Sequence, residues 1–429
     1  MWSEVRHLKM ISPEAGTDFS TTRVSESSGL LRGKRVAVVV FSHYPSDPRP
    51  RRAAEVLVQL GMDVEVVCLR QDKGEPRREV FNGVSIRRIS LKRRRGGKFS
   101  YLFQYSAFLL FSFLILAFRS FKRRFHLVHV HNMPDVLVFA ALVPKALGAK
   151  VILDLHDPMP ELMTTIFGLP PESFGVRLLK KFEKWSVRFA DAVLTVNLAC
   201  KRIFTARGCP SEKVHVVMNS PDENIFNYQS ARQAPDSSSS TKPFIIMYHG
   251  SLVERHGLDL AVNALGMIQR TIPRAELRIY GRSTPFLEQV LGLVRNSGLQ
   301  DAVRYLGSKT LEQIVEAIDE CDVGIIPNRR SIFTEINTPT RIFEYLSRGK
   351  PVIAPAVPGI QDYFSDGQLV FFELGNANDL ARKLEYVWLH PQEVERTVES
   401  GRAVYRNHKW SAERTKFTNL AGKLLAAGN

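Results

Sequence analysis

The chain has few cysteines, and the four it has are far apart. Cys68, Cys200, Cys209 and Cys321 form no CxxC pair within 429 residues. Structural zinc sites and disulfide frameworks rely on closely or regularly spaced cysteines, so neither is indicated. We interpret each cysteine as a small buried hydrophobic residue of a protein in a reducing, cytoplasmic compartment. We expect no bound metal and no other cofactor.

Common nucleotide and targeting signatures are also missing. The sequence contains neither GxGxxG nor GxxxxGK[ST], which weakens the case for NAD chemistry and for a P-loop ATPase. Residues 1–32 are polar, of mixed charge, and lack the apolar core of a secretory signal. We expect them to form a flexible N-terminal leader.

Acidic residues are in deficit. The chain carries 59 lysines and arginines against 43 aspartates and glutamates, for a formal charge of +16. Such a charge favours partners that carry phosphate: nucleic acid, an anionic membrane surface or a phosphorylated substrate. Many of the basic residues flank one apolar segment and are not interleaved with exposed aromatics. We therefore expect no nucleic-acid partner and keep a nucleic-acid-binding protein only as an alternative function.

That apolar segment spans residues 101–118, with a basic run before it at 92–95 and another after it at 119–124. Its length is at the lower limit for crossing a bilayer, which takes about 20 residues. It also lies between predicted strands of one sheet, which a spanning helix would split. Two interpretations remain: a buried helix that covers the sheet, or a helix whose outer face dips into an anionic bilayer. We favour the second, with peripheral or monotopic attachment to the inner face of the cell membrane.

Apolar runs rich in β-branched residues alternate with amphipathic segments along most of the chain. This alternation is typical of doubly wound parallel α/β sheets. We predict an N-terminal Rossmann-like domain at 33–228, a serine-rich linker at 229–242, a C-terminal Rossmann-like domain at 243–408 and a final helix at 409–429. The predicted strands are 34–42, 62–69, 84–89, 127–131, 150–155, 192–196 and 214–217, then 244–248, 276–280, 303–306, 323–325 and 351–354.

The segment 337–354 is the most informative motif. It reads as a polar loop with Asn337, Thr338 and Thr340, a short helix carrying Glu344, a Gly-Lys-Pro turn and a buried strand. A helix start favours anions because its first N–H groups are unpaired and the helix dipole is positive there. A carboxylate one turn further along accepts hydrogen bonds from a vicinal diol. Phosphate and ribose together describe a nucleotide.

A second motif follows the strand at 244–248. Gly250 permits close approach of a ligand to the backbone, and Ser251, Arg255 and His256 lie before the next helix. Cationic donors at such a place stabilise a leaving nucleotide diphosphate.

Polar residues also follow two strands of the first half. His156 and Asp157 follow the strand at 150–155, and His43 and Arg49 lie in the first strand-to-helix loop. Ligands of parallel sheets bind at the carboxyl ends of strands, so these residues are candidates for a site in the cleft. His129 and His131 share one face of a strand, but we identify no further ligands and predict no metal site.

These motifs resemble the donor site of retaining glycosyltransferases of the GT-B fold, family 4. The resemblance covers roughly residues 34–425 and implies a metal-independent hexosyltransferase with the nucleotide sugar on the second domain and the acceptor on the first. It implies that Glu344 binds the ribose, that His156 contacts the sugar, and that the last helix crosses back onto the first domain. It also places His43, Arg49 and Asp157 on the acceptor side. The absence of a DxD motif counts against metal-dependent GT-A transfer.

The chain departs from the family pattern in two places. The position eight residues before Glu344, usually a glutamate, is Ile336. Either Glu335 is its catalytic replacement, or Asn337 and backbone amides do its work. Ser251 and His256 stand where the family has arginine and lysine, and we consider Arg255 as the substitute cation. The charge and the apolar helix suggest a lipid-linked saccharide acceptor in cell-surface polysaccharide or glycolipid assembly. A GT-B sugar-nucleotide epimerase is the other alternative function.

Overall fold

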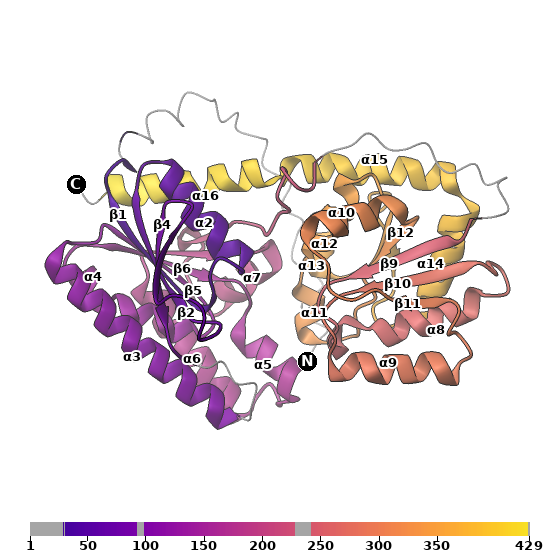
Figure 1. Cartoon of the computed structure of the whole chain (residues 1–429), viewed down its shortest axis with the longest axis horizontal. Helices are drawn as coiled ribbons and strands as arrows, with labels where there is room; N and C mark the ends of the chain where they lie inside the picture. Colours follow the sequence, from indigo (N-terminus) through magenta and orange to yellow (C-terminus); the bar gives the residue numbers. More distant parts are fainter. Residues whose placement is uncertain (1–28, 30, 92–97, 228–241, 428–429) are drawn as a thin grey trace.

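The computed structural model describes residues 29, 31–91, 98–227 and 242–427, which form two α/β domains side by side (Figure 1). The predicted leader at 1–32 and the predicted linker at 229–242 fall almost wholly outside the described residues. The basic run at 92–95 lies outside them entirely. The predicted α/β class with two Rossmann-like domains is confirmed.

The N-terminal sheet has the order β3-β4-β2-β1-β5-β6-β7-β8, and all its neighbours are parallel except β3 with β4. Its strands are β1 (Arg35–His43), β2 (Asp63–Leu69), β3 (Arg78–Phe81), β4 (Val84–Ile89), β5 (Leu127–His131), β6 (Lys150–Leu155), β7 (Ala192–Thr195) and β8 (Val214–Val216). The edge strand β3 was not predicted. The Asn82-Gly83 pair that joins it to β4 has positive φ at both residues, which is a common hairpin signal.

Helices cover both faces of this sheet. On one face lie α3 (Lys98–Lys122), η2 (Asp135–Ala141), α4 (Leu142–Ala146), α6 (Phe174–Phe189) and α7 (Leu198–Ala206), and on the other lies α2 (Pro48–Gln59). The short helix α5 (Met159–Phe167) faces the second domain (Figure 1). Among the described residues, only α3 is long and apolar enough to cross a membrane. Its Phe108 and Leu116 side chains are buried in the domain core, which holds the helix against the sheet.

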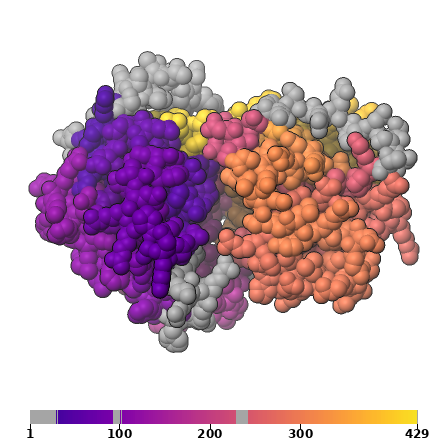
Figure 2. Space-filling model, viewed as in Figure 1, coloured from indigo at the N-terminus to yellow at the C-terminus, as the bar shows by residue number. Residues whose placement is uncertain are grey.

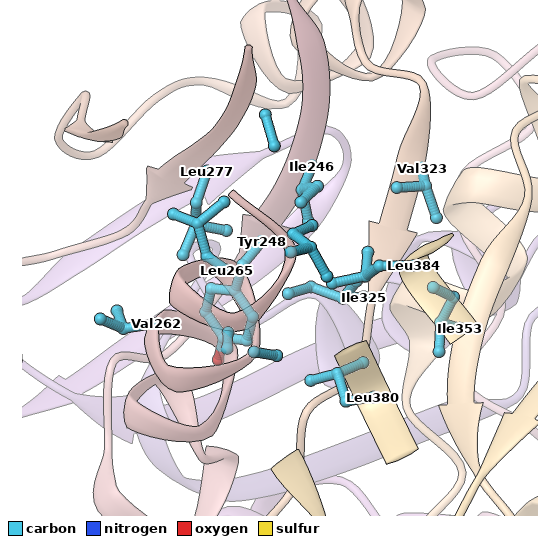
Figure 3. Close-up of a cluster of buried hydrophobic side chains, with 14 of the residues drawn as sticks. Ile246, Tyr248, Val262, Leu265, Leu277, Val323, Ile325, Ile353, Leu380 and Leu384 are labelled. Atoms are coloured by element: carbon cyan, nitrogen blue, oxygen red, sulfur yellow. The ribbon is translucent and has the colours of Figure 1, made fainter. Parts of the chain in front are cut away.

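The C-terminal sheet is parallel throughout, in the order β11-β10-β9-β12-β13-β14. Its strands are β9 (Phe244–His249), β10 (Ala275–Tyr280), β11 (Val303–Tyr305), β12 (Val323–Ile325), β13 (Val352–Pro355) and β14 (Val370–Phe372). One face packs on α8 (Leu258–Ile268), α9 (Pro285–Asn296) and α14 (Ala377–Leu389), and Figure 3 shows part of this core. The other face carries α10 (Leu311–Glu320), α12 (Thr340–Ser347) and α13 (Pro358–Gln361).

The last two helices connect the domains. Helix α15 (Pro391–Asn407) packs on the C-terminal domain, and α16 (Trp410–Ala426) continues across onto the N-terminal domain (Figure 1). There, Phe417 and Leu425 join the core cluster that contains β1 and β2. The fully buried Glu413 carboxylate accepts a hydrogen bond from Met218 N at 2.9 Å. Helix α16 is therefore part of the N-terminal core, although it ends the chain.

Candidate active site between the two domains

The candidate site lies where the two parallel sheets bring their strand-end loops toward each other, across the furrow visible in Figure 2. The domains touch beside it. Asn197, at the start of α7, donates its Nδ2 to Ile336 O at 2.8 Å and to Thr338 Oγ1 at 3.0 Å. Tyr363 OH accepts from Leu198 N at 2.8 Å. These contacts fix the loop that precedes α12 against the N-terminal domain.

Helix α12 positions Glu344 through the residues that flank it. Phe343 and Tyr345 are buried on the C-terminal sheet, so the helix cannot rotate without exposing them. The Tyr345 ring lies against Gly324 of β12, where a Cβ atom would come within 2.4 Å of it. The Tyr345 hydroxyl donates to Met247 O at 3.0 Å. Glu344 is thereby presented to the end of β9, where its Oε2 lies 3.3 Å from His249 Nε2.

Burial sets the protonation of this pair. It raises the pKa of Glu344 to about 7, although Arg341 and Arg52 act in the opposite direction. Burial, helped by Arg341, lowers the pKa of His249 to about 3. At neutral pH the imidazole is therefore uncharged, and the carboxyl is close to the midpoint of its titration. Arg52 belongs to α2, so the N-terminal domain influences this carboxyl directly.

The loop after β9 is held by its own side chains. Tyr248 OH donates to Ser251 O at 2.8 Å, and His256 Nδ1 lies 2.9 Å from the same carbonyl. A carbonyl only accepts, so that ring nitrogen carries the proton. Burial, together with Arg341, lowers the pKa of His256 to about 3. His256 is thus a neutral group that shapes the loop.

Arg341, on the first turn of α12, reaches this loop. Its Nη1 donates to His249 O at 2.6 Å, and its guanidinium carbon lies 4.6 Å from the centre of the Tyr248 ring. A Cβ atom on Gly250 would be only 2.7 Å from Nη1, so only glycine leaves room for the guanidinium there. Sequence reasoning did not select Arg341. Its spacing of three residues from Glu344, which puts both on one helix face, was the available signal.

On the N-terminal side, Asp154 at the end of β6 is the centre of a buried polar cluster. Arg49 binds it through Nε, at 3.1 Å from Oδ1 and 3.0 Å from Oδ2, and through Nη2 at 2.7 Å from Oδ1. His129 Nε2 and His131 Nδ1 each lie 3.4 Å from Oδ2. Burial acts to raise the pKa of Asp154, but Arg49 and the neighbouring histidines outweigh it and hold that pKa well below its usual range.

The same cluster has the spacing of a metal site, since ligand atoms of His129, His131 and Asp154 lie within 4.8 Å of one another. Arg49, however, already binds both oxygens of the carboxylate. Its Nη1 also donates to Val217 O at 2.8 Å and to Asn219 Oδ1 at 3.0 Å. The arrangement is that of a charge-neutralised structural cluster behind the cleft.

His156 and Asp157 extend from this cluster toward the second domain. His156 Nε2 lies 2.9 Å from His131 Nδ1, and burial lowers the pKa of His156 to about 4 in spite of Asp154. Burial raises the pKa of Asp157 to about 6, opposed first by Arg255 of the C-terminal domain and then by Arg49. Asp157 and Arg255 therefore influence each other across the domain boundary.

The structure thus gathers most of the predicted site residues around one place. Glu344, Gly250, Ser251, Arg255 and His256 come from the C-terminal domain, and His156, Asp157 and Arg49 lie on the N-terminal side. His43 ends β1, and its Nδ1 is buried with no hydrogen-bond partner among the described residues. Thr340 begins α12 and Asn337 follows α11 (Ile332–Ile336).

Two predicted residues are placed differently. Glu335 lies 3.7 Å from Arg330 and lines a hollow of about 380 Å³ formed with the segments around β13 and β14. The catalytic role of Glu335 stays a prediction. The Thr338 hydroxyl donates to Gly359 O and accepts from Asn197, so it serves the contact between domains. Besides Arg341, the sequence-based prediction missed His249, Arg52 and Asn197.

Two facing Rossmann-like domains, joined by a returning C-terminal helix and carrying a site between their strand ends, define a GT-B protein. Residues 46–220 match the family described as Glycosyl transferase 4-like domain, and residues 229–404 match Glycosyl transferases group 1. The chain belongs to the family-4-like GT-B glycosyltransferases.

Individual relatives are distant. The chain is 24% identical over 174 residues to the amylovoran biosynthesis glycosyltransferase AmsK of Erwinia amylovora, which covers 40% of this chain and 41% of AmsK. It is 22% identical over 193 residues to a glycogen synthase of Mycobacterium tuberculosis, covering 45% and 44%. The matches thus span less than half the length of these curated relatives.

Solved structures show the same fold. The sucrose-phosphate synthase of Thermosynechococcus elongatus superposes with a TM-score of 0.72 at 18% identity, covering 92% of this chain and all of the other. Anabaena HepE in complex with UDP-glucose superposes with a TM-score of 0.66 at 14% identity, covering 91% and 99%.

Proposed function

We propose that this protein transfers a sugar from a nucleotide-sugar donor to an acceptor hydroxyl. The observation that carries the proposal is the placement of Glu344. This partly buried carboxylate lies 3.3 Å from His249 at the end of β9, and Arg52 of the other domain is one of the charges that act on its pKa. Family membership supports this, as does the fold shared with a protein whose structure holds UDP-glucose.

Each polar group has a role in this proposal. Glu344 accepts hydrogen bonds from the ribose hydroxyls. Arg255 and the backbone N–H groups around Gly250 and Thr340 stabilise the departing diphosphate, because preorganised donors act strongly on charge that develops in the transition state. His156, which is uncharged at neutral pH, lies near the sugar. We further propose retention of configuration without a metal, with the leaving phosphate accepting the proton of the acceptor hydroxyl.

The exposed face of α3 suggests what kind of acceptor the protein uses. Large apolar side chains recur along it at helical spacing: Leu102, Phe103, Leu110, Phe111, Leu114, Phe118 and Phe121. Phe103 is 72% exposed and Phe121 is 75% exposed, which is unusual for phenylalanine in water. Arg119, Lys122, Arg123 and Arg124 lie at the carboxyl end of the helix. This combination fits a helix lying in the headgroup layer of an anionic membrane.

Helix α6 adds a basic stripe on the same side of the molecule. It covers the same sheet face as α3, with η2 packed against both helices. Its exposed residues are Phe174, Arg177, Lys181, Lys184, Trp185 and Arg188, and its one acidic residue, Glu183, is buried. We propose that α3 and α6 attach the protein to the inner face of the cell membrane. The acceptor is then a saccharide carried on a lipid, in cell-surface polysaccharide or glycolipid assembly.

A donor panel tests the first part of the proposal. UDP-, GDP-, ADP- and dTDP-sugars are screened by thermal shift, and the donor that binds is incubated with and without lipid-linked acceptors. We expect one nucleotide to stabilise the protein and a glycosylated lipid of unchanged anomeric configuration, formed equally well with EDTA. A product formed from the donor alone would indicate an epimerase. The absence of any shift together with no donor turnover would refute the proposal.

Vesicle flotation tests the second part. Replacing Phe103, Phe118 and Phe121 with serine should abolish binding to vesicles that contain anionic lipid, and Lys181→Glu with Lys184→Glu should weaken it in a salt-dependent way. Met267→Ser with Leu389→Ser removes exposed apolar residues from the C-terminal domain and is the matched control. A wild-type protein that stays off anionic vesicles at low salt would contradict membrane attachment.

A further inference from the structure

We propose that Arg341 is the principal diphosphate-binding cation of the donor site. This inference rests on the proposed function, because it assigns a partner to the phosphates of the nucleotide. It adds a cation on the first turn of α12 to Arg255 of the loop after β9, to which the proposed function already gives a part in binding the diphosphate.

The place occupied by Arg341 carries the argument. Its guanidinium lies directly over Gly250, where the backbone is free of side-chain atoms. The Tyr248 ring supports one side of the group at 4.6 Å, and Nη1 is anchored on His249 O at 2.6 Å. A guanidinium has five N–H donors, so these contacts fix the group without exhausting its capacity to bind an anion.

Two of the three other candidates on the loop, His256 and Ser251, bring no positive charge to a phosphate. His256 uses Nδ1 to hold Ser251 O, and it is uncharged at neutral pH. Ser251 brings no charge. Burial lowers the pKa of Arg255, Asp157 of the opposite domain opposes this shift, and the Arg255 guanidinium carbon lies 5.8 Å from the centre of the Phe333 ring. A diphosphate held against Gly250 therefore meets the guanidinium of Arg341 first.

Arg341 and Glu344 also form a single recognition unit. They are three residues apart on α12 and so share one helix face, with Arg341 nearer the positive end of the helix dipole. The Arg341 charge is among the groups that lower the pKa of Glu344. On this one short helix, Glu344 accepts hydrogen bonds from the ribose and Arg341 donates hydrogen bonds to the diphosphate. The two groups are neighbours on the helix, as the ribose and the diphosphate are neighbours in a nucleotide.

Isothermal titration with a matched ligand series tests this assignment. The nucleoside diphosphate, monophosphate and nucleoside of the base preferred by the wild type are compared on wild type, Arg341→Gln and Arg341→Lys. We expect Arg341→Gln to lose about 10- to 100-fold in affinity for the diphosphate, the range of one or two charge-assisted hydrogen bonds. Nucleoside affinity should stay within about twofold. Arg341→Lys should lie between, because lysine keeps the charge but not the fork geometry.

A relocation variant and a charge control complete the design. His256→Lys placed in the Arg341→Gln background returns a cation to the loop and should recover part of the diphosphate affinity. Arg330→Gln removes an exposed charge outside this site and should leave affinity unchanged. Equal losses for nucleoside and diphosphate, or unchanged diphosphate affinity in Arg341→Gln, would overturn the assignment while the proposed function stands. A wild type that binds no nucleoside diphosphate would overturn both.

Discussion

His249 Nε2 and Glu344 Oε2 lie 3.3 Å apart, and burial drives both groups toward their neutral forms. It lowers the pKa of the imidazole to about 3 and raises that of the carboxyl to about 7. Without a ligand the imidazole is therefore uncharged at neutral pH, and the carboxyl is close to the midpoint of its titration. Hydrogen bonds from the ribose hydroxyls to Glu344 favour the ionised carboxylate. Binding of the nucleotide sugar and ionisation of Glu344 are therefore linked.

Glu344→Gln should weaken donor binding, and Glu335→Gln is its matched control. The glutamine keeps the shape of the side chain but loses hydrogen bonds to a charged acceptor, on the order of 1.5–3 kcal/mol each. Glu335 lies beside Arg330 in the hollow near β13 and β14, so its substitution should change donor affinity by less than about threefold. Titration calorimetry with the preferred nucleotide measures both. An equal loss of donor affinity in the two variants would show that Glu335 also takes part in donor binding.

Nucleoside affinity should rise with pH through neutrality. Only the ionised form of Glu344 can accept a hydrogen bond from a ribose hydroxyl at each of its two oxygens. The raised pKa of about 7 means that this form is scarce at pH 6 and dominant at pH 8. The unphosphorylated nucleoside is the right probe because its affinity does not depend on phosphate ionisation. The profile should flatten in Glu344→Gln. A profile that keeps its slope in that variant would assign the titration to another group.

Asn197→Asp should loosen the contact between the domains. The aspartate keeps the oxygen that caps α7 through Cys200 N at 2.7 Å, but it removes the donor to Ile336 O and Thr338. It also places a negative charge beside a carbonyl oxygen. We expect a loss of about 1–3 kcal/mol in stability and a larger radius of gyration by small-angle X-ray scattering. Unchanged scattering would show that other contacts hold the domains together.

Arg49→Gln should destabilise the N-terminal domain by about 3–5 kcal/mol in urea unfolding, because it leaves the buried Asp154 carboxylate without its cation. The pKa of Asp154 is held well below its usual range, so the stability it contributes is present above the unfolded-state pKa of about 3.9. That contribution is lost as the pH falls toward the folded-state pKa. The gap between variant and wild type should therefore narrow below about pH 4. Asp154→Asn added to Arg49→Gln should recover part of the loss.

The sequence predicted most secondary structure because that information is local. The strands at 84–89, 127–131, 150–155 and 323–325 were predicted to the residue, since each has β-branched or other apolar residues at most of its buried positions. Edge elements were harder. The strand β3 (Arg78–Phe81) lies at the edge of the sheet and pairs with β4 alone. Its residues are mostly exposed and two of them are charged, so it contains no apolar run that would predict a strand.

Single site residues were predictable only where a motif carried them. Glu344 followed from its place in a packed helix beside a polar loop, and His156 from the end of a strand. Glu335 was chosen for its distance along the chain from Glu344, and its carboxylate lies 3.7 Å from Arg330. Spacing along the sequence does not say which way a short helix faces.

The sequence by itself determined two Rossmann-like domains, the helix that carries Glu344 and the glycine loop after β9, because hydrophobic periodicity and turn chemistry act between near neighbours. Only the tertiary structure decided what meets at the site. His249 and Arg341 are 92 residues apart, and Asn197 and Ile336 are 139 apart. Such pairs form because parallel sheets gather the ends of separate strands at one edge. Burial at that edge then shifts the pKa values that decide which groups are charged. The degree of burial depends on the tertiary structure, so residues close together in the sequence do not reveal it.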